Sequence, residues 1–416
     1  MNPEWLERGK AHVWRPYCQH QTAPDPLAVV AARGCRLTLA DGSVVVDGIA
    51  SWWTAAHGYG HPHIAARVLQ QLERLPHVAF GGLAHEAGYS LATRLASLFP
   101  EPLNRVFFVE SGSVAVEVAL KISLRGALGG SSKTDVVAFS GAYHGDTFAT
   151  MALCDPAGMH GPSRGAFPVH HFAIPGTGDP LDQHFEERFA AVAGTTAACI
   201  IEPLLQAAGG MRFHDVDVLR RVRAACTRHD VALIFDEVAT GFFRTGRRFA
   251  LEEAAVVPDV VVVGKALTGG TLPLAAVVAS DALFAAFLSD DAGRALQHGP
   301  TYMANPLACA AAHGSLDLFE AEDYGAKVTA LEHKLRAGLS PLSSRASVRE
   351  VRVKGGVGVV ELEPGTAPSS SSFAARGAFV RPLRFADRDL VYLMPPLVID
   401  DDDLGVLFGA LAAEIA

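Results

Sequence analysis

Residues 231–270 read VALIFDEVATGFFRTGRRFALEEAAVVPDVVVVGKALTGG. Two apolar runs in this stretch, Ala232–Phe235 and Val260–Val263, lead into the charged residues Asp236 and Lys265. Runs that are apolar throughout, rather than alternating, are typical of strands covered on both faces of a parallel sheet. In open α/β sheets, ligands bind outside the carboxyl ends of the strands. The stretch therefore predicts two buried strands that present a carboxylate and an amine to a ligand crevice.

Similar apolar runs recur on both sides of this stretch. They are Val106–Val109, Val136–Phe139, Ala198–Ile201 and Leu274–Ala279. Longer helical patterns, such as Val114–Leu124 and Val216–Arg228, lie between the runs. The alternation predicts an α/β fold with a mostly parallel central sheet.

The two ends of the chain have a different pattern. Val29–Val46 indicates a small meander with Asp41-Gly42 as its hairpin turn. Beyond about Glu320 we expect one long helix followed by short strands, and Pro364–Ser372 is typical of a surface loop. We therefore predict a smaller α+β domain built from both chain ends. The expected limits are 51–315 for the large domain, with 1–50 and 316–416 forming the small one.

Composition limits the possible functions. The 416 residues include 35 basic and 44 acidic side chains, and the net charge of −9 opposes non-specific binding to nucleic acid. No run of about 18 apolar residues could span a membrane, and Met1–Lys10 lacks the apolar stretch of a signal peptide. Six scattered cysteines without a CxxC pair predict free thiols in a reducing cytoplasm. His85-Glu86 lacks the second histidine of a zinc-protease helix, so no metal site is expected.

Lys265 and Asp236 carry the first chemical hypothesis. A lysine after a buried strand should be partly desolvated, which lowers the pKa of its amine and makes it a nucleophile for a carbonyl. The other interpretation is a surface lysine whose stem packs on apolar neighbours. A carboxylate such as Asp236 could hold Mg²⁺ in an ATPase, but that requires GxxxxGK[ST], and Gly264-Lys265 is followed by Ala266. The ATPase hypothesis is therefore excluded.

The turn from Glu110 to Ser113 joins a predicted strand to a helix that starts near Val114. Small residues there let backbone N–H groups approach an anion at the helix N-terminus. Taken alone, the turn is better explained as a helix cap without a ligand. Together with Asp236 and Lys265 it matches the needs of pyridoxal 5'-phosphate, because the phosphate binds a helix N-terminus, the ring nitrogen an acid, and the aldehyde an amine.

Ile234–Phe242, followed by Arg244-Thr245-Gly246, resembles the signature of the class III aminotransferases. Eight further motifs are similar to those of the family members that make 7,8-diaminononanoate for biotin, and the likeness runs from about Trp14 to Pro396. These motifs are SWW at 51–53, HGY at 57–59, FGG at 80–82, SGSVAVE at 111–117, YHGDT at 143–147, GKALTGG at 264–270, HGPT at 298–301 and YLMPP at 392–396. The resemblance implies the fold-type I architecture of pyridoxal-phosphate transferases.

The same resemblance implies roles at the cofactor. Lys265 would form the Schiff base and then move the proton between the substrate's α-carbon and the cofactor. Asp236 would keep the ring nitrogen protonated, and Tyr143 would stack over the ring. The alternative, a core tyrosine, is weak because His144-Gly145 follows Tyr143. The residues expected around the phosphate are Gly112, Ser113 and Thr301, with Pro300 beside them.

At the substrate, the resemblance implies that Tyr17 and Trp52 shape the pocket, with Tyr143, Lys265 and Gly299 nearby. Tyr17 is also expected to take part in catalysis, and Trp53 to belong partly to the core. Arg381 would bind the carboxyl end of the keto substrate, since its planar fork can bond both oxygens. A surface ion pair is the alternative for Arg381, and the long polar stretch 383–389 could shift it.

The implied reaction is a ping-pong transamination of 8-amino-7-oxononanoate to 7,8-diaminononanoate. S-adenosylmethionine is the expected amino donor, although some members use lysine. The rival enzyme is another class III aminotransferase, acting on ornithine or 4-aminobutyrate, which is not expected to combine Trp52-Trp53 with Tyr17. A scaffold protein without activity is the non-enzymatic rival, and the retention of Lys265, Asp236 and Tyr143 argues against it. The resemblance also implies a homodimer in which Thr301 serves the neighbouring active site, so that each site needs two chains.

Overall fold

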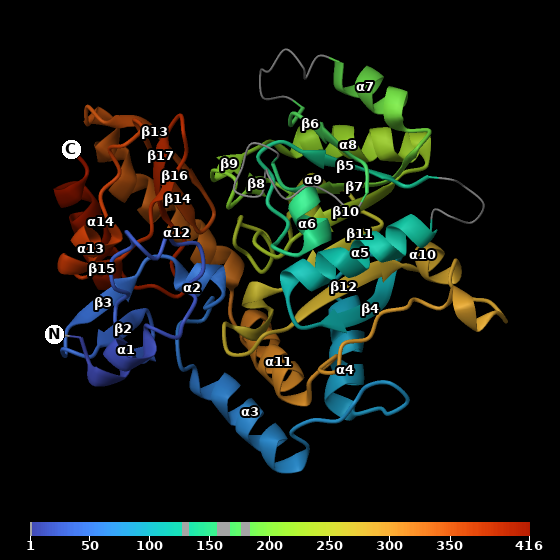
Figure 1. Cartoon of the computed structure of the whole chain (residues 1–416), viewed down its shortest axis with the longest axis horizontal. Coiled ribbons are helices and arrows are strands. Elements are labelled where there is room, and N and C mark those ends of the chain that lie inside the picture. Colours follow the sequence, from blue (N-terminus) through green and yellow to red (C-terminus); the bar gives the residue numbers. More distant parts are fainter. Residues whose placement is uncertain (1, 127–132, 156–166, 176–183) are drawn as a thin grey trace.

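The computed structural model describes residues 2–126, 133–155, 167–175 and 184–416. Its centre is a seven-stranded sheet in the order β4-β12-β11-β10-β7-β5-β6 (Figure 1). The strands are β4 (Leu103–Val109), β5 (Asp135–Phe139), β6 (Val169–Phe172), β7 (Thr196–Ile201), β10 (Ala232–Asp236), β11 (Val260–Val263) and β12 (Ala275–Ser280). All six predicted runs are strands of this sheet, and the predicted α/β class is confirmed.

Two features of the sheet were not predicted. Strand β12 runs antiparallel to both β11 and β4, whereas the other pairs are parallel. A parallel return needs a crossover of about a dozen residues or more, usually a helix. The 264–274 connection holds only the short 3₁₀ helix η2 (Lys265–Thr268), so the chain turns straight back. Strand β6 at the sheet edge was missed because its sequence, VHHF, is not an apolar run.

The apolar runs face two hydrophobic cores, one on each side of the sheet. In β11, Val261 and Val263 belong to one core, and Val260 and Val262 belong to the other. Helix α5 packs on one face, and α4, α8 and α11 contribute to the core on the opposite face. This arrangement explains why the strands show no polar alternation. The helices of this region are α3 (Pro62–Arg74), α4 (Glu86–Ala96), α5 (Gly112–Gly126), α6 (Phe148–Leu153), α7 (Phe185–Val192), α8 (Val216–His229), α9 (Ala250–Ala254), α10 (Asp281–Ala285) and α11 (Pro306–Ala321).

The two chain ends lie side by side (Figure 1). One sheet joins β1 (Val29–Arg33), β2 (Arg36–Leu39) and β3 (Val44–Asp47) to β15 (Ala378–Phe379) from the C-terminal part. The antiparallel pairs β1–β2 and β2–β3 form the predicted meander, and β15 pairs with β3 in parallel. The domain limits at residues 50 and 315 remain a prediction.

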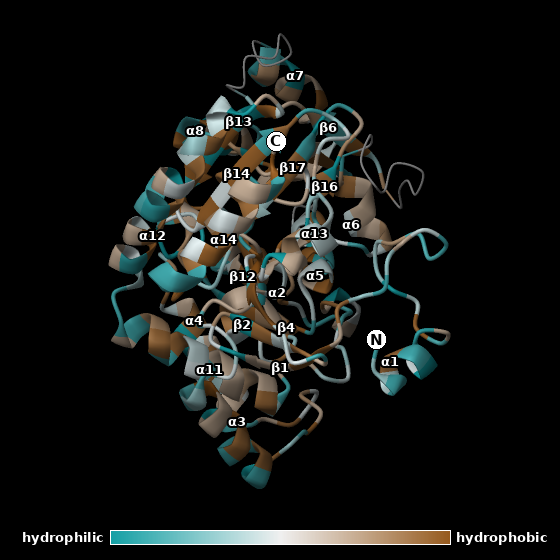
Figure 2. Cartoon of the chain, turned by 90° about the vertical axis from the view of Figure 1, so that its left-hand side faces the viewer, coloured by the Kyte–Doolittle hydropathy of each residue, from teal (hydrophilic) through white to brown (hydrophobic). Residues whose placement is uncertain are grey.

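A second small sheet, in the order β13-β14-β17-β16, belongs to the C-terminal part. In Figure 2 its strands β14 and β17 are largely hydrophobic, and α12 and α14 lie near them with hydrophilic stretches. The elements here are α12 (Tyr324–Leu339), β13 (Val348–Lys354), β14 (Val357–Leu362), α13 (Ser370–Ala375), β16 (Leu383–Arg384), β17 (Asp389–Leu393) and α14 (Asp401–Glu414). The remaining elements are α1 (Glu4–Gly9), α2 (Ala50–Trp53), β8 (Leu205–Gln206), β9 (Arg212–Phe213), η3 (Ala292–Arg294) and η4 (Ser340–Ser344).

Two expectations about the C-terminal part need correction, and one stretch without a predicted conformation is now defined. The chain ends in the helix α14 rather than in short strands, because Asp400 caps a run with buried Leu404, Leu407 and Leu411. The 364–372 stretch is only partly a surface loop, since α13 begins inside it and Ala367 is buried. The polar 383–389 stretch is a hairpin joining β16 to β17.

All six cysteines are free thiols in the structure. Within the described ranges, no helix combines the length and the hydropathy that a membrane span requires.

Candidate active site

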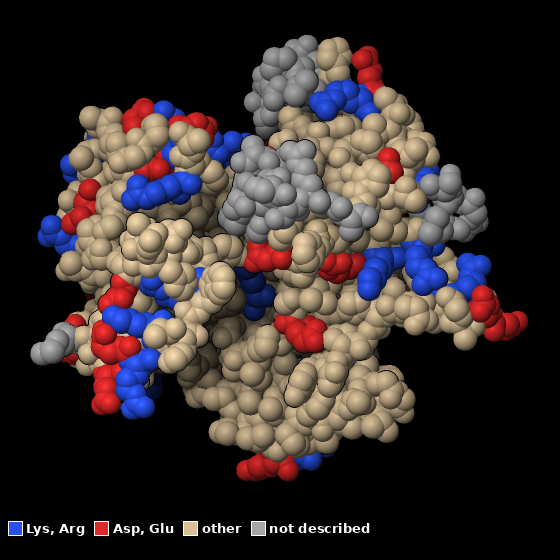
Figure 3. Space-filling model, viewed as in Figure 1, with Lys and Arg blue, Asp and Glu red and all other residues tan. Residues whose placement is uncertain are grey.

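A cavity of about 290 Å³ lies at the carboxyl ends of the central strands. Its lining comes from three places: the turn between β4 and α5, which includes Gly112, the segment from Lys265 to Leu274, and Thr54. Figure 3 shows this face of the molecule hollowed between its two halves, with basic atoms in the hollow and acidic ones at its edge. The sheet therefore brings Lys265 and the turn at Gly112 to one cavity, whereas the lining of this cavity does not include Asp236.

Lys265 stands in a tight turn directly after β11. Its backbone is left-handed, with φ of 42°, and its Nζ lies 4.9 Å from the ring centroid of Trp53. Burial lowers the pKa of Lys265, while the carboxylates of Asp236, Glu202 and Asp146 act in the opposite direction. A desolvated amine that loses its proton more readily is the form that attacks a carbonyl.

Asp236 ends β10 and is buried, with 5% of its surface exposed. Its Oδ2 lies 2.8 Å from Nδ1 of His144, and its Oδ1 accepts a hydrogen bond from the backbone N–H of Val238 at 3.2 Å. These contacts hold one carboxylate in a fixed orientation at the end of the strand. The partnership with His144 was not predicted, because the two residues are 92 positions apart in the chain.

Glu202 is a second buried carboxylate that was not anticipated. It accepts hydrogen bonds from the backbone N–H groups of Tyr143 at 2.9 Å and Ala207 at 3.0 Å. Burial raises the pKa of Glu202 to about 7. The signal was present in the sequence, since Glu202 directly follows the apolar run Ala198–Ile201 as Asp236 follows its own.

The N-terminus of α5 packs closely against the 143–147 segment. Ser113 Oγ accepts a hydrogen bond from the backbone N–H of Asp146 at 3.2 Å. Gly145 has φ of 124°, and a Cβ there would lie 2.2 Å from Ser113 Oγ, so only glycine fits. The first N–H groups of a helix have no partner within the helix and favour an anion. Gly112 and Ser113 thus lie where a phosphate group could bind.

Tyr143 and Tyr17 meet at Asp146. The Tyr143 hydroxyl donates to Asp146 Oδ1 at 2.9 Å, and the Tyr17 hydroxyl donates to Asp146 Oδ2 and lies 3.2 Å from the Tyr143 hydroxyl. Burial raises the pKa of both tyrosines. Both hydroxyls therefore stay protonated at neutral pH.

Tyr17, Trp52 and Arg381 form a group that we call the aromatic wall. The rings of Tyr17 and Trp52 meet edge to face with centroids 5.8 Å apart. The Arg381 guanidinium carbon lies 4.9 Å from the Trp52 centroid and 5.9 Å from that of Tyr17. These distances allow cation–π attraction, which orients the guanidinium. Three segments that are distant in sequence thus meet in one surface.

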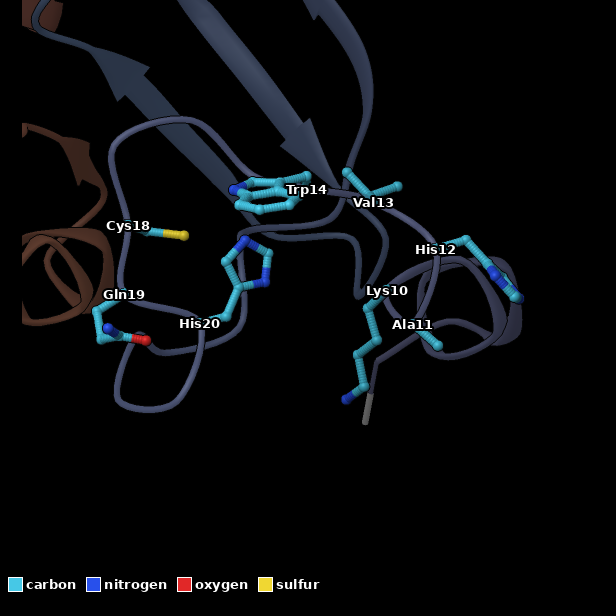
Figure 4. Close-up of a pocket in the computed structure, with 8 residues that line it drawn as sticks. All are labelled: Lys10, Ala11, His12, Val13, Trp14, Cys18, Gln19 and His20. Atoms are coloured by element: carbon cyan, nitrogen blue, oxygen red, sulfur yellow. The ribbon is translucent and has the colours of Figure 1, made fainter.

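The loop that presents Tyr17 has an open hollow of about 520 Å³ (Figure 4). In that view Trp14 lies over His20, and the two rings meet edge to face with centroids 6.3 Å apart. Arg15 ties the loop together, since its backbone N–H donates to His20 Nε2 at 3.0 Å and its Nη1 donates to Pro24 O at 2.6 Å. The hollow is formed by a single local segment, and we assign it no ligand.

Gly299, Pro300 and Thr301 lie in the loop between η3 and α11. The loop contacts the side of α5, where His298 Nδ1 lies 3.0 Å from Lys121 Nζ. Gly299 and Thr301 are exposed. Among the described residues of this single chain, the cavity lining includes no member of this loop. In this single chain, Gly112 thus lines the cavity and Thr301 does not.

Comparisons with known proteins agree with this geometry. The model of the class III aminotransferase family matches residues 17–415. The chain is 39% identical to an adenosylmethionine-8-amino-7-oxononanoate aminotransferase from Corynebacterium glutamicum, over 100% of this chain and 99% of that protein. The crystal structure of an enzyme of the same name from Methanocaldococcus jannaschii superposes with a TM-score of 0.91 at 28% identity, covering 99% of this chain and 98% of that one. A pyridoxal-phosphate-bound amine transaminase from an uncultivated Pseudomonas species gives a TM-score of 0.90 at 30% identity, covering 97% and 98%.

Proposed function

This chain belongs to the class III aminotransferases, and we propose that it transfers an amino group to 8-amino-7-oxononanoate, giving 7,8-diaminononanoate for biotin synthesis. The proposed amino donor is S-adenosylmethionine. One observation carries the proposal beyond the family. Two consecutive tryptophans contact two cations, Trp53 at Lys265 and Trp52 at Arg381. Lys265, whose amine can react with a carbonyl, and Arg381, whose guanidinium can bind a carboxylate, thus both contact this short segment. The arrangement suits a long keto acid with a carboxyl end.

The site fits pyridoxal 5'-phosphate as cofactor. Lys265 offers an amine whose pKa burial lowers, Asp236 a buried carboxylate, and α5 an N-terminus reached through small residues. The cofactor would supply an aldehyde for the amine and a ring that accepts electrons. Gly112 and Ser113 would hold its phosphate, Asp236 its ring nitrogen, and Tyr143 would lie against its ring.

The protein's own groups have distinct tasks in this proposal. Lys265 Nζ takes the proton from the substrate carbon that bears the amino group, and later returns a proton. Asp236 keeps the proton on the ring nitrogen, since a carboxylate favours a neighbouring positive charge. The hydroxyls of Tyr17 and Tyr143, fixed by Asp146, orient the substrate and exclude water. Arg381 binds the carboxylate end through two parallel hydrogen bonds.

The experiment that tests the activity holds the keto acid constant and varies the donor. Purified protein loaded with pyridoxal phosphate receives 8-amino-7-oxononanoate and either S-adenosylmethionine or lysine, and diamine formation is measured by mass spectrometry. We expect diamine with S-adenosylmethionine and none from a Lys265→Ala control. Turnover of ornithine or 4-aminobutyrate, with no diamine from either donor, would instead establish the rival aminotransferase activity.

We further propose that the active sites are shared between two chains of a homodimer, with Thr301 serving the phosphate of the neighbouring site. The exposure of Thr301 and its place outside the cavity lining of its own chain support this arrangement. A two-fold interface would repeat the contact and complete both sites.

Free thiols at all six cysteines are consistent with a reducing cytoplasm as the place of action.

Co-expression of two inactive chains tests the sharing. One chain carries Lys265→Ala and the other carries Thr301→Trp. If sites are shared, a mixed dimer has one site with both changes and one site with neither, so partial activity returns. If Thr301 serves its own chain, every site keeps one change and the mixture stays inactive.

A further inference from the structure

The segment Ala50–Trp53 is a left-handed turn made without glycine. Its four residues have φ of 47°, 47°, 54° and 75° in chain order. For L-residues this conformation brings Cβ too close to the following carbonyl oxygen, so left-handed runs are rare. Such strained segments persist only where their surroundings fix them, and they gather at functional sites.

Asp47, the last residue of β3, holds this turn. Its side chain is buried, and its Oδ1 accepts a hydrogen bond from the backbone N–H of Ile49 at 2.8 Å. Its Oδ2 accepts from the Ser51 N–H at 2.8 Å and from the Tyr59 hydroxyl at 2.5 Å. The Tyr59 hydroxyl also lies 2.6 Å from Ser51 Oγ. One carboxylate therefore bonds the turn at two backbone positions and through a tyrosine.

Tyr59 is itself fixed to the N-terminal meander. Its backbone N–H donates to Gly34 O at 2.7 Å, and its carbonyl accepts from the Gly34 N–H at 3.1 Å. The turn is closed by backbone bonds from Trp53 N–H to Ile49 O and from Thr54 N–H to Ala50 O, both 2.8 Å long. The handedness of the turn decides where its side chains point. It directs the Trp53 ring to Lys265 and the Trp52 ring to Arg381.

We propose that Asp47 is a positioning residue for substrate binding, which fixes the left-handed turn so that Trp52 and Trp53 contact Arg381 and Lys265. Asp47 touches neither the cavity lining nor the aromatic wall in the contacts described above. It acts through the backbone of Ser51, so its loss should displace the two rings while leaving the sheet and the cofactor-binding groups in place. Only the kinetic test of this inference rests on the proposed function.

Asp47→Asn is the sharpest variant. Asparagine keeps the size and one acceptor oxygen, but its NH₂ cannot accept the Ser51 N–H, so this backbone contact is lost, whereas the Tyr59 hydroxyl can still pair by accepting from the NH₂. We expect the KM for the keto acid to rise about ten-fold, the effect of losing one hydrogen bond to a charged group. The visible absorbance of bound pyridoxal phosphate should be unchanged, because Asp236 ends β10 and Lys265 stands in the turn after β11, and neither contacts Asp47 in the bonds described above.

Asp135→Asn is the matched control. Asp135 is also buried and accepts hydrogen bonds from a hydroxyl, that of Thr195 at 2.6 Å, and from His170 at 2.9 Å, but it lies at the opposite end of β5 from the cavity. Its loss should lower stability without moving KM. A crystal structure of Asp47→Asn adds a readout that needs no activity, and we expect residues 50–53 to leave the left-handed region.

The outcomes separate the two proposals. An active wild type with unchanged KM in Asp47→Asn, or an equal KM rise in Asp135→Asn, would overturn the positioning role. A wild type that makes no diamine overturns the proposed function, and the crystal structure then still decides whether Asp47 holds the turn. If Asp47→Asn does not fold, Tyr59→Phe replaces it, because this variant keeps both backbone bonds to Asp47. A rise of about three-fold in the KM for the keto acid, with unchanged absorbance, supports the positioning role. An unchanged KM contradicts it.

Discussion

Lys265 and Asp236 take their positions from strands β11 and β10, whereas Tyr17, Trp52 and Arg381 take theirs from segments outside any long helix or strand. On the sheet side, each strand is fixed by hydrophobic cores on both of its faces. Lys265 has a left-handed backbone with φ of 42°, and Tyr17 and Trp52 in the aromatic wall have φ of 50° and 54°, so strain occurs on both sides and the support around it is what differs. Arg381 follows the two-residue strand β15.

The difference shows two ways of placing a side chain accurately. The sheet side depends on many apolar contacts, each of which contributes little, so few single substitutions should move its groups. The aromatic wall depends on a few polar contacts, such as those of Asp47, and the loss of any one of them should shift the side chains of the wall. Substitutions that leave the fold intact should therefore alter substrate binding more readily than cofactor binding. Substitutions at four positions test this contrast, from the largest expected effect to the smallest.

Lys265→Ala should have the largest effect. It removes the amine that binds the aldehyde and moves the proton, so we expect turnover to fall by at least about a thousand-fold. The protein should stay folded, because β11 keeps its four buried valines, and the visible absorbance of covalently bound cofactor should disappear. Lys133→Ala is the control, since Lys133 donates only to backbone carbonyls of His229 and Asp230 among the bonds described for it. Normal turnover in Lys265→Ala would refute the assignment of the sheet side.

The same contrast explains what the sequence could predict. Asp236 and Lys265 were found because an apolar run followed by one charged residue is a local pattern. Glu202 has the same pattern and was overlooked, whereas the contact of His144 with Asp236 joins residues distant in the chain. The left-handed turn could not be foreseen, because Ala-Ser-Trp-Trp contains no glycine and its conformation depends on Asp47 and Tyr59. The reversal of β12 was overlooked, because the predicted runs Val260–Val263 and Leu274–Ala279 already leave a connection short of a crossover helix.

Arg381→Ala tests the wall directly. If the guanidinium binds the keto acid's carboxylate, the loss of a charge-assisted bidentate contact should cost about 1.5–3 kcal/mol, roughly ten- to hundred-fold, in the second half-reaction. The first half-reaction, with the donor, should change less. Single-turnover measurements of each half-reaction distinguish the two. Arg381→Lys keeps the charge but not the fork, and should recover only part of the loss. Equal damage to both half-reactions would count against this role.

Ser51→Gly and Ser51→Ala isolate the strain of the left-handed turn. Both variants lose the hydroxyl that contacts Tyr59, but only glycine adopts φ of 47° without a steric cost. We expect Ser51→Gly to have the larger free energy of unfolding, by about 1 kcal/mol. At Gln70, an exposed position of helix α3, the order should reverse by a similar amount, because glycine weakens a right-handed helix. Chemical denaturation measures both pairs, and the same order at both positions would show that residue 51 bears no strain.

Glu237→Gln tests the sheet side through the pH dependence of stability. Glu237 is fully buried, accepts the Thr240 hydroxyl at 2.6 Å on Oε2, and accepts the Leu251 N–H at 3.3 Å on Oε1. Burial raises the pKa of Glu237 to about 8, from an ordinary value of 4.5. Between these two values the folded protein binds more protons than the unfolded chain, so the free energy of unfolding should fall as the pH rises.

Glutamine does not titrate, and it can keep both contacts: its oxygen accepts from Leu251, and its NH₂ donates to the Thr240 hydroxyl. The slope of stability against pH should therefore be shallower in Glu237→Gln than in the wild type. It should not vanish, because burial also raises the pKa of Glu202, to about 7. Denaturation curves from pH 5 to about 8.5 measure the slope, and equal slopes in the two proteins would contradict the assignment. Glu237→Gln should therefore gain stability relative to the wild type as the pH approaches 8, because only the wild type must ionise this buried carboxylate.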